Sequence, residues 1–560
     1  MSLQRFRVTL NSLMILTFLG GCVSHHVEPL STALDEEAFR EHVRILATDD
    51  FEGRKPGTPG EQKTVAYLVE QFTKLGLKPG NGASFTQAVP LVELTAANDT
   101  TLNIAGHGAN TSLVYGRDAV IWTPQVQPEV SVANSELVFV GHGVVAPDYN
   151  WDDYAGVDVR GKTVVVLIND PGFFRNDPTL FKGRTMTYYG RWTYKFEEAA
   201  RHGAAAVLIV HDTAAAGYGW NVIQSSWMGP QLDRVTPDAS AGRPAVEGWI
   251  SAAPAKALFA QAGMNLEESI TAASQRGFKA RPMGLQANSR IHTSIRFSTS
   301  ANVLAVLPGS ERPKEYVVYM AHWDHFGMTV QPSGTQIFHG AIDNATGVAA
   351  VLTLAQSLSR MPRRPARSIV FLCTTAEEAG LLGSAYYVEH PVYPLKDTAA
   401  VINIDAMHVG GPTRDVSVVG FGNSELETYL RTAASYQGRE LRPEPQPEQG
   451  EFFRSDHFSF AKAGVPALYA KAGIDDTEQG PKWGQAQEDA YLEHRYHQPA
   501  DTYSADWDVR GTMQDLELYL AVGERLAHDR RFPNWFPNSE FRAIRERDRP
   551  EDAHGHSIEQ

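Results

Sequence analysis

The sequence predicts an α/β fold: a mixed, mostly parallel central sheet flanked by helices on both faces, with an inserted smaller α/β domain. Three observations support this class. From Asn302 onward, continuously apolar segments alternate with helical patterns, as strands covered on both faces do. A second, separate alternation lies between residues 130 and 290. Finally, 560 residues, 42 % of them hydrophobic, suffice for a large core and more than one domain.

A secretory signal layout occupies residues 1–21, which we leave out of the fold. Arg5 and Arg7 precede an apolar run, 13–19, that is too short to span a membrane as a mature helix. The ending "LGGC" at Cys22 resembles the bacterial lipobox, in which the cysteine is lipidated; an ordinary cleaved signal is the alternative. Because no aspartate follows directly, we expect an exported lipoprotein of the outer membrane that faces the periplasm, or else a secreted protein. Its only membrane contact would be the lipid anchor at Cys22.

Charge and cysteine content exclude some partners and cross-links. The 50 basic and 65 acidic residues give a net charge of -15, and no basic run is long enough to bind a phosphate backbone. We therefore expect no nucleic-acid partner. Apart from Cys22, which is expected to carry the lipid, Cys373 is the only cysteine, so no intramolecular disulfide is expected. The oligomeric state does not follow from the sequence.

The first segment of the larger domain, residues 22–129, opens with two helices. Between Ala38 and Leu77 the pattern is helical, with apolar residues spaced for one stripe at Val65, Leu68, Val69, Phe72 and Leu75. The stretch "DDFEGRKPGTPGEQ" separates the helices. It contains two prolines and three glycines, so we expect a loop there.

The inserted domain is assigned to residues 130–290. Short β-like runs at 137–140 and 163–168 are separated by turn-forming residues, and "EEAARHGAAAVLIVHD" predicts a helix followed by a strand. This pattern indicates a separate α/β unit.

The main part of the larger domain is assigned to residues 291–530. Strands are expected at 316–321, 368–374 and 399–404, and a helix with its apolar stripe between Val348 and Leu358. A tail, 531–560, is expected to pack through aromatic residues before becoming disordered; these are Trp535, Phe536 and Phe541.

Potential metal ligands stand where the predicted strands end. Ligands of such sheets bind beyond the carboxyl ends of the strands. Taken singly, each residue has an ordinary explanation as a helix cap, a turn residue or a core histidine. Together, their carboxylates would repel one another unless one or two zinc ions, bound by imidazole and carboxylate, supplied positive charge. The residues are His322, Asp324, Asp343, Glu377, Glu378 and Asp405.

Two adjacent glutamates follow one of these strands. Side chains that leave a strand at neighbouring positions point in different directions. One of Glu377 and Glu378 can therefore bind metal while the other faces the attacking water as a general base.

Six motifs in this order resemble those of the co-catalytic di-zinc peptidases, the family that includes bacterial leucine aminopeptidases and glutamate carboxypeptidase. They are "AHWDHFG", "GAIDNATGVAAVL", "TTAEEAGLLGS", "NIDAM", "RSDHFSFAKAGVPAL" and "YHQPADT". The entry "LATDDFEGRKPGTPG" is similar to the family's amino-terminal loop, and the insert resembles a protease-associated domain. The resemblance covers essentially the whole mature chain.

The resemblance implies a site for two Zn²⁺ ions. Asp343 would bridge both ions. His322 and Asp405 would complete the protein ligands of one ion, and Glu378 and His497 those of the other. Three protein ligands at each ion leave room for a shared water, as a catalytic site requires.

The resemblance also implies roles around the ions. Glu377 would be the general base, and Tyr496 would hydrogen-bond the oxyanion. Asp324 would accept the second ring N–H of His322. The peptide bond between Asp343 and Asn344 is expected to be cis.

Several nearby residues have weaker assignments. Ile342 stands where relatives often have an acid, which should not harm the site. We interpret His325 and His339 as loop or substrate-facing residues. Asp456 and His457, in "RSDHF", match a family motif near the substrate pocket but have no derivable role. Asp501 is a candidate partner of His497.

The implied function is a zinc-dependent exopeptidase acting on peptides. An aminopeptidase is favoured, because a substrate α-amine would meet the acidic cluster. A carboxypeptidase is the alternative, and it would need cations such as Arg454 or Arg191 to hold a terminal carboxylate. Two other functions are less favoured. A glutaminyl cyclase of similar fold works with one zinc, and non-catalytic relatives such as the transferrin receptor have lost metal ligands. This chain has all five ligand positions filled.

Overall fold

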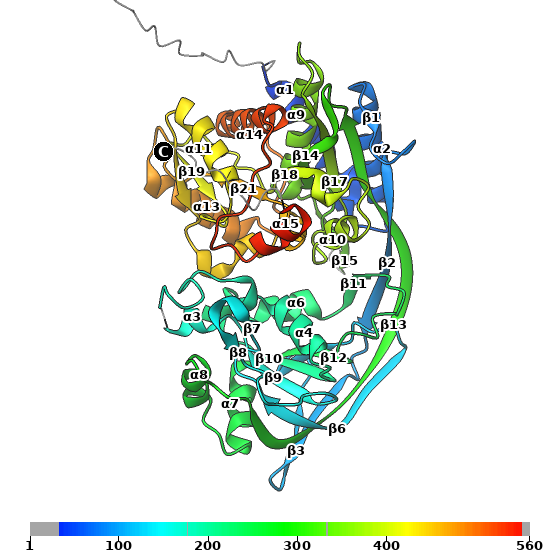
Figure 1. Ribbon diagram of the computed structural model, residues 1–560. Coiled ribbons are helices and arrows are strands. Elements are labelled where there is room, and N and C mark those ends of the chain that lie inside the picture. Colours follow the sequence, from blue (N-terminus) through cyan, green and yellow to red (C-terminus); the bar gives the residue numbers. More distant parts are fainter. Residues whose placement is uncertain (1–32, 176, 332–333, 551–560) are drawn as a thin grey trace, which may run out of the picture.

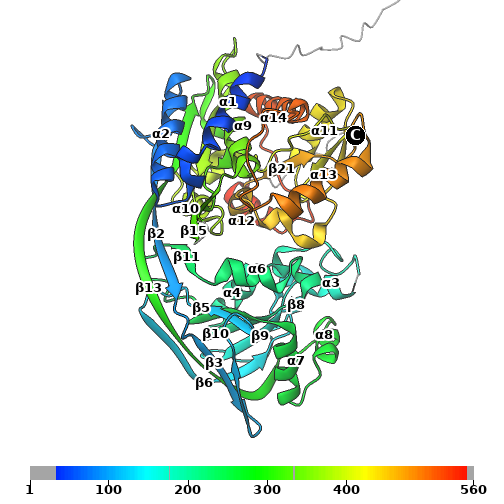
Figure 2. The ribbon, with the colours of Figure 1, turned by 180° about the vertical axis from the view of Figure 1, so that it is seen from behind.

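The computed structural model describes residues 33–550 except 176 and 332–333, and Figure 1 shows it as two domains, one above the other. The predicted signal segment, the lipid anchor at Cys22 and the last ten residues of the tail lie outside the described residues. Figure 2 shows the same arrangement from behind, with two long strands running along one side of both domains.

The larger domain is built on a mixed sheet whose centre is parallel. The strands predicted at 316–321, 368–374 and 399–404 are confirmed, and each lies parallel to its neighbour. The order across the sheet is β11 (Pro230–Arg234), β2 (Thr86–Ala96), β13 (Arg281–Leu307), β17 (Arg367–Thr374), β14 (Arg312–His322), β18 (Thr398–Asn403), β21 (Ala467–Ala472), β19 (Asp415–Val418) and β20 (Glu440–Pro443).

Helices cover both faces of this sheet because its central strands are apolar on both sides. In β14, Val317 and Tyr319 face one core, whereas Val318 and Met320 face the other. The first core takes α1 (Glu36–Leu46), α2 (Pro59–Lys74), α9 (Gly347–Ser359), α11 (Leu426–Tyr436) and α14 (Arg510–His528); the second takes α10 (Leu382–Glu389) and α12 (His457–Lys462), with Trp535 and Phe541 of the tail. The predicted fold class is thus confirmed.

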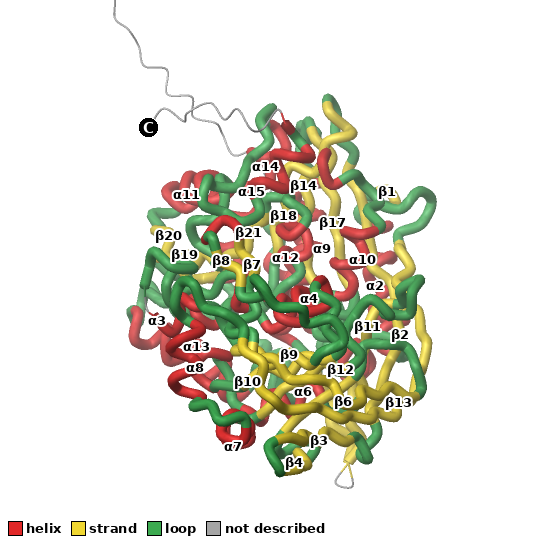
Figure 3. The backbone as a smooth tube through the Cα atoms, turned by 60° about the horizontal axis from the view of Figure 1, so that its bottom comes forward, coloured by secondary structure: helices red, strands yellow, loops and turns green. Residues whose placement is uncertain are grey.

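The smaller domain has its own sheet and two cores, one on each face. Figure 3, which turns the bottom of Figure 1 forward, shows its strands in yellow. Their order is β4 (Ala109–Leu113), β3 (Thr101–Gly106), β13, β6 (Glu129–Phe139), β9 (Thr163–Leu167), β10 (Ala206–Val210), β12 (Val246–Ile250) and β5 (Ala119–Trp122). The helices α7 (Ala252–Gln261) and α8 (Leu266–Ala273) cover one face; α4 (Trp192–Arg201), α5 (Thr213–Ala216) and α6 (Trp220–Trp227) cover the other.

The predicted start of the insert at residue 130 was wrong. Leu102, Ile104 and Ile121 are buried in the core of the smaller domain, and β3, β4 and β5 pair within its sheet. The smaller domain therefore begins near β3. Its predicted end at residue 290 falls inside a single strand, β13, which has 27 residues. Up to His292 that strand pairs with β3 and β6, and from Thr293 it pairs with β2.

The insert is also anchored to the larger domain by the segment 182–191. Met186 is buried in the second core of the larger domain, and the Tyr188 ring lies 5.0 Å from that of Phe458. Lys462 Nζ donates to the Tyr188 hydroxyl at 2.9 Å and pairs with Glu197 at 2.8 Å. As a result, the side of the insert that carries α4 and α6 faces the larger domain (Figures 1 and 2).

Shorter elements complete the chain. The hairpin of β15 (Gly327–Gln331) and β16 (Gly334–Phe338) follows β14. Of the predicted loop, 49–62, the first residues form the 3₁₀ segment η1 (Asp49–Arg54). Irregular chain follows up to Thr58, and the last four residues belong to α2. Within the described part of the chain, every helix is too short or too polar to cross a membrane.

The tail gives a test of the second core. Trp535 is fully buried, and its indole Nε1 donates to the Gly464 carbonyl at 2.9 Å. We expect Trp535→Ala to lower the free energy of unfolding by about 3–5 kcal/mol in urea denaturation. Tyr436→Ala, at an aromatic residue that is 87 % exposed, should change it by about 0.5 kcal/mol or less. Equal losses in both variants would show that the tail does not support this core.

Candidate metal centre

Two histidines and four acids meet beyond the carboxyl ends of parallel strands. His322 is the last residue of β14, Asp405 follows β18, and Glu377 and Glu378 follow β17. Because these three strands are parallel neighbours, their ends bring the side chains to one edge of the sheet. Asp343 comes from η4 (Ala341–Thr346), the turn that leads into α9, and His497 follows α13 (Pro481–His494).

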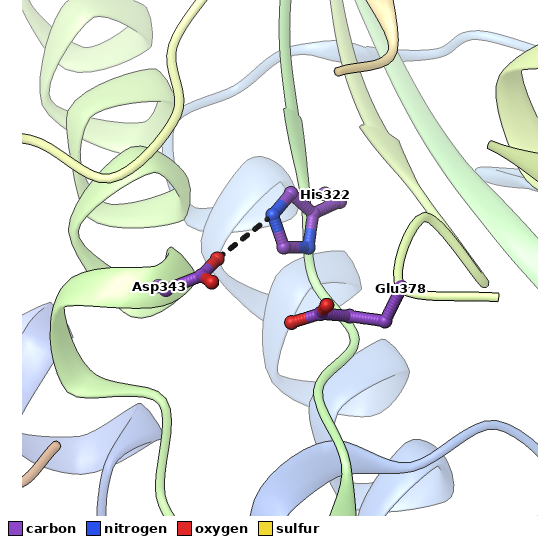
Figure 4. Close-up of side chains that lie close together, drawn as sticks. All are labelled: His322, Asp343 and Glu378. Carbon is purple, nitrogen blue, oxygen red and sulfur yellow. Dashed lines mark ion pairs between the residues drawn. The ribbon is translucent and has the colours of Figure 1, made fainter. Parts of the chain in front are cut away.

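Asp343 lies at the centre of the group, and its two carboxylate oxygens face different imidazoles. Its Oδ1 is 3.2 Å from His322 Nε2, and its Oδ2 is 3.3 Å from His497 Nε2. Figure 4 shows Asp343 between the helix turn and His322, with Glu378 approaching from the other side. The peptide bond between Asp343 and Asn344 is cis, as predicted.

Each imidazole also faces a second carboxylate. His322 Nε2 lies 3.2 Å from Asp405 Oδ1, and His497 Nε2 lies 3.3 Å from Glu378 Oε2. The site therefore consists of two sets, each with one imidazole, one private carboxylate and one oxygen of Asp343. The five residues predicted as ligands thus lie together, and their binding of metal stays a prediction.

Glu377 belongs to neither set at these short distances. Its Oε2 is 4.0 Å from His322 Nε2, and the residue is 8 % exposed. Burial raises the pKa of Glu377 well above its usual range, and the nearby Asp405 and Glu378 raise it further despite the opposing effect of His322. A carboxyl group with this environment is suited to hold and release a proton.

The pKa values of the two imidazoles are raised by the surrounding carboxylates. Burial on its own would lower the pKa of His322, but the carboxylates of Glu377, Asp405 and Asp343 raise it well above its usual range. The pKa of His497 is likewise raised, because Glu378 and Asp343 outweigh its burial. The carboxylates thus favour positive charge at two positions, one beside His322 and one beside His497.

These donors fit zinc. Imidazole nitrogen and carboxylate oxygen are zinc ligands, and each set offers three protein ligands, as open catalytic sites do. Ligand atoms of His322, Asp343 and Glu378, and of His322, Glu377 and Asp405, also lie within 4.8 Å of one another. The excess of buried carboxylate over cationic side chains provides a physical reason for cations at this place.

Asp324 makes a different contact from the predicted one. His322 Nδ1 lies 3.1 Å from the Asp324 backbone carbonyl and 3.8 Å from its carboxylate. The carboxylate instead accepts the backbone N–H groups of Glu377 at 3.0 Å and Glu378 at 3.4 Å. The histidine is therefore oriented by a carbonyl oxygen, while the Asp324 side chain fixes the turn that aims the two glutamates.

Asp501 does not contact His497, contrary to the prediction. Its carboxylate accepts the backbone N–H groups of Ile342 at 3.0 Å and Asp343 at 3.1 Å, so it holds the peptide of the central ligand. The chain turns back toward this site after His497, which has φ of 57°. Sequence spacing alone could not reveal which backbone groups the turn would reach.

Two further residues hold ligand carboxylates, and sequence reasoning did not assign them. Ser455 Oγ donates to Asp405 Oδ2 at 2.5 Å. His325 lies in the loop after β14, as predicted, but it is buried, and its Nδ1 lies 2.6 Å from Glu378 Oε1. The second histidine of "HWDH" was the available signal for this contact. The remaining candidates lie apart from the ligand atoms: Asp456 bonds Thr374, His457 packs against Phe452 and Tyr469, and His339 pairs with Asp49.

Tyr496 stacks on His497, with ring centroids 3.8 Å apart, and is 37 % exposed. Its ring therefore borders the ligand set. Arg454, one residue before Ser455, acts electrostatically on Tyr496 and on Arg191 of the insert. An arginine of each domain thus lies close enough to the other to act on it, and Arg454 also acts on Tyr496 beside the ligand set.

Comparison with known proteins agrees with this geometry. Residues 302–521 match the model of Peptidase family M28. Aminopeptidase NAALADL1 of Mus musculus is 33 % identical over 129 residues, covering 22 % of this chain and 16 % of that protein. A glutamate carboxypeptidase 2 homolog of Caenorhabditis briggsae is 31 % identical over 428 residues, covering 67 % of this chain and 51 % of that protein. The chain thus spans about half or less of the length of these relatives.

A solved structure, the aminopeptidase from Aneurinibacillus sp. strain AM-1, has a TM-score of 0.49 and 21 % sequence identity, and the match covers 89 % of this chain and 95 % of that one.

The hydrogen bonds of Asp501 predict an indirect effect on metal binding. Asp501→Ala leaves two buried N–H groups beside Asp343 without their acceptor, so the apparent zinc affinity should fall about tenfold to a hundredfold in competition with a fluorescent chelator. Asp501→Asn keeps one acceptor oxygen and should lose less. Asp508→Ala removes a more exposed carboxylate of the same region and should leave the affinity unchanged. An unaltered affinity in Asp501→Ala would exclude this role.

Proposed function

We propose that this chain, whose residues 302–521 belong to peptidase family M28, is a zinc-dependent exopeptidase with two zinc ions, and that it removes amino-terminal residues from peptides. The observation that supports this most is the placement of Asp343. Its two oxygens each face one imidazole, and each imidazole has its own further carboxylate. His322 and Asp405 would hold one ion, Glu378 and His497 the other, and Asp343 both.

The reaction is amide hydrolysis. Zinc, when bound, lowers the pKa of water and polarises the scissile carbonyl. Glu377 then accepts a proton from the attacking water and holds it until the amine leaves. The same residue returns that proton to the leaving nitrogen, so the enzyme ends in its starting state.

Tyr496 supplies the other polar group of the reaction. Its stacking on His497 holds the ring beside the ligand set, and its hydroxyl can donate a hydrogen bond to the oxygen that becomes negative. Asp324 and Ser455 act earlier, by fixing the glutamates and Asp405 before the substrate arrives.

The charge of the site supports one direction of cleavage over the other. The metal centre presents an excess of carboxylate, which favours a substrate α-amine at the inner end of the site. That preference supports an aminopeptidase. A cyclase that uses one zinc is less well supported, because both ligand sets are complete, and so is a non-catalytic binding protein.

A carboxypeptidase is the second candidate, and one observation favours it. Within the described residues neither Arg191 nor Arg454 forms an ion pair within 4.0 Å, and the Nε atom of each is buried without a hydrogen-bond partner. Burial and the nearby Arg454 lower the pKa of Arg191 to about 10, so the Arg191 guanidinium group stays charged at neutral pH. A free carboxylate of a short peptide would relieve this repulsion.

The location of the protein stays a proposal as well. We propose that the chain is exported and lipidated at Cys22, which attaches it to the outer membrane on the periplasmic side. We also propose that the insert is a protease-associated domain, since it is a separate α/β unit whose α4 and α6 face the larger domain (Figure 1).

Replacing the base tests the chemistry. Glu377→Gln should lower kcat about a hundredfold to ten-thousandfold on aminoacyl chromogenic substrates, because the amide cannot accept the proton. Its zinc content should equal that of the wild type, and chelator should abolish wild-type turnover. Glu440→Gln, at an exposed glutamate, should behave as the wild type. Turnover that survives both chelator and Glu377→Gln would refute the mechanism, and acylated peptides that react as fast as free-amine ones would refute the direction.

Replacing the arginines tests the second candidate. If they hold a carboxylate, Arg454→Gln and Arg191→Gln should raise KM about tenfold to a hundredfold for short peptides with a free carboxyl end. Peptides with a carboxyl-terminal amide should show no change. Arg184→Gln alters an arginine of the same segment of the insert that is half exposed and pairs with Glu448, and it should have no effect. Equal losses on acid and amide substrates would assign the arginines to packing alone.

A further inference from the structure

Arg54, in the amino-terminal loop, makes four hydrogen bonds to backbone carbonyls. Its Nε donates to Trp323 at 2.9 Å, Nη1 donates to Leu46 at 2.8 Å and His339 at 2.6 Å, and Nη2 donates to Gly340 at 2.8 Å. Three segments far apart in the chain therefore converge on one guanidinium group. No function assigned above uses this residue.

The side chain is deeply buried and has no acidic partner in contact. Arg54 is 1 % exposed, and in the described part of the chain it forms no ion pair within 4.0 Å. A buried charge without a contacting counter-ion is costly unless its donors are satisfied, and here four carbonyl dipoles satisfy them. The carboxylates of Asp501, Asp343 and Asp324 act on it over a longer distance.

The backbone around Arg54 is also constrained. Arg54 has φ of 52°, in the left-handed region that favours glycine. Its neighbour Gly53 has φ of 65°, and a side-chain carbon there would lie 2.4 Å from the Phe338 carbonyl and 2.5 Å from that of Gly327. The loop thus packs closely against the base of the β15–β16 hairpin at Gly53. Arg54 adopts an unfavourable backbone conformation, and in that conformation its side chain points into the protein.

The carbonyls that Arg54 holds stand beside the predicted ligands. Trp323 directly follows His322, and Gly340 precedes Asp343 by three residues. Arg54 therefore ties the end of β14 to the turn that carries the central ligand.

A second contact extends this arrangement to Glu378. The Arg54 carbonyl accepts the His325 N–H at 3.4 Å, and a side-chain carbon on Gly340 would lie 2.6 Å from the His325 ring. His325 Nδ1 in turn lies 2.6 Å from Glu378 Oε1. The loop thus supports one residue of each ligand set as well as the central one.

We propose that Arg54 is a positioning residue of the metal centre: through its hydrogen bonds to the carbonyls of Trp323, His339 and Gly340 it fixes the spacing between His322 and Asp343. This inference rests on the proposed zinc function. The geometry needed is a planar fork with donors in three directions. A lysine in the same place keeps the charge but presents its donors from one point, so it cannot reach carbonyls on all three segments.

The test compares Arg54→Lys and Arg54→Met with the wild-type mature protein. Hydrogen exchange of the metal-free proteins is measured by mass spectrometry for peptides that cover 322–326 and 339–344, and zinc affinity by competition with a chelator. We expect exchange in both loops to rise at least tenfold in either variant, and zinc affinity to fall about tenfold to a hundredfold. If Arg54→Met does not fold, Arg54→Lys decides the outcome alone.

Arg367→Lys is the matched control, because Arg367 is another fully buried arginine that donates to backbone carbonyls. Arg367 is the first residue of β17. Its guanidinium group donates to the carbonyls of Leu526, Arg530 and Arg531 and pairs with Glu315. It should lose stability without a change in loop exchange at the site or in zinc affinity. The proposal is overturned if Arg54→Lys matches the wild type in both measurements, or if its exchange rises uniformly across the chain. Absence of zinc from the wild type would instead refute the proposed function, while the exchange data would still decide the part that Arg54 plays.

Discussion

The crowding of negative charge at one edge of the larger sheet is the constraint on which the rest of the site depends. Five carboxylates converge where β14, β17 and β18 end, and water is largely excluded from them; they are Asp324, Asp343, Glu377, Glu378 and Asp405. Such a group is unstable unless each member has its own compensation. The chain supplies it in three forms: imidazoles between the ligand carboxylates, backbone N–H groups for Asp324, and the charge of Arg54 behind the cluster. Metal ions would supply the remainder.

The convergence of the candidate ligands could be predicted from the sequence, because parallel strands deliver their last residues to a common edge and position along the chain translates directly into proximity. His322, Asp405 and the glutamate pair follow this rule. The supporting contacts do not. Asp324 was expected on the imidazole of His322 and Asp501 on His497, yet both carboxylates accept backbone N–H groups instead. Backbone donors have no signature in the sequence, and the turn at His497 that brings Asp501 back cannot be read from residue type.

The larger domain's strands were predicted where they are buried on both faces, and missed where one face is open. In β13, buried and exposed residues alternate from Met283 to Thr293, which lacks the continuous apolar run that marks β14 or β17. The same reason accounts for the wrong start of the insert. β3 and β4 are short and partly exposed, and only their pairing with β13 shows that they belong to the smaller core.

The length of β13 also determines how the two domains can move relative to each other. Hinge closure requires a few residues whose φ and ψ are free to change. At the crossing from one domain to the other, β13 has no such residues, because its ladder with β6 runs to His292 and its ladder with β2 begins at Thr293. The segment 182–191 fastens the opposite side of the insert. The two domains are therefore held together on both sides, by β13 and by the segment 182–191, and this crossing offers no hinge about which one domain could turn toward the other.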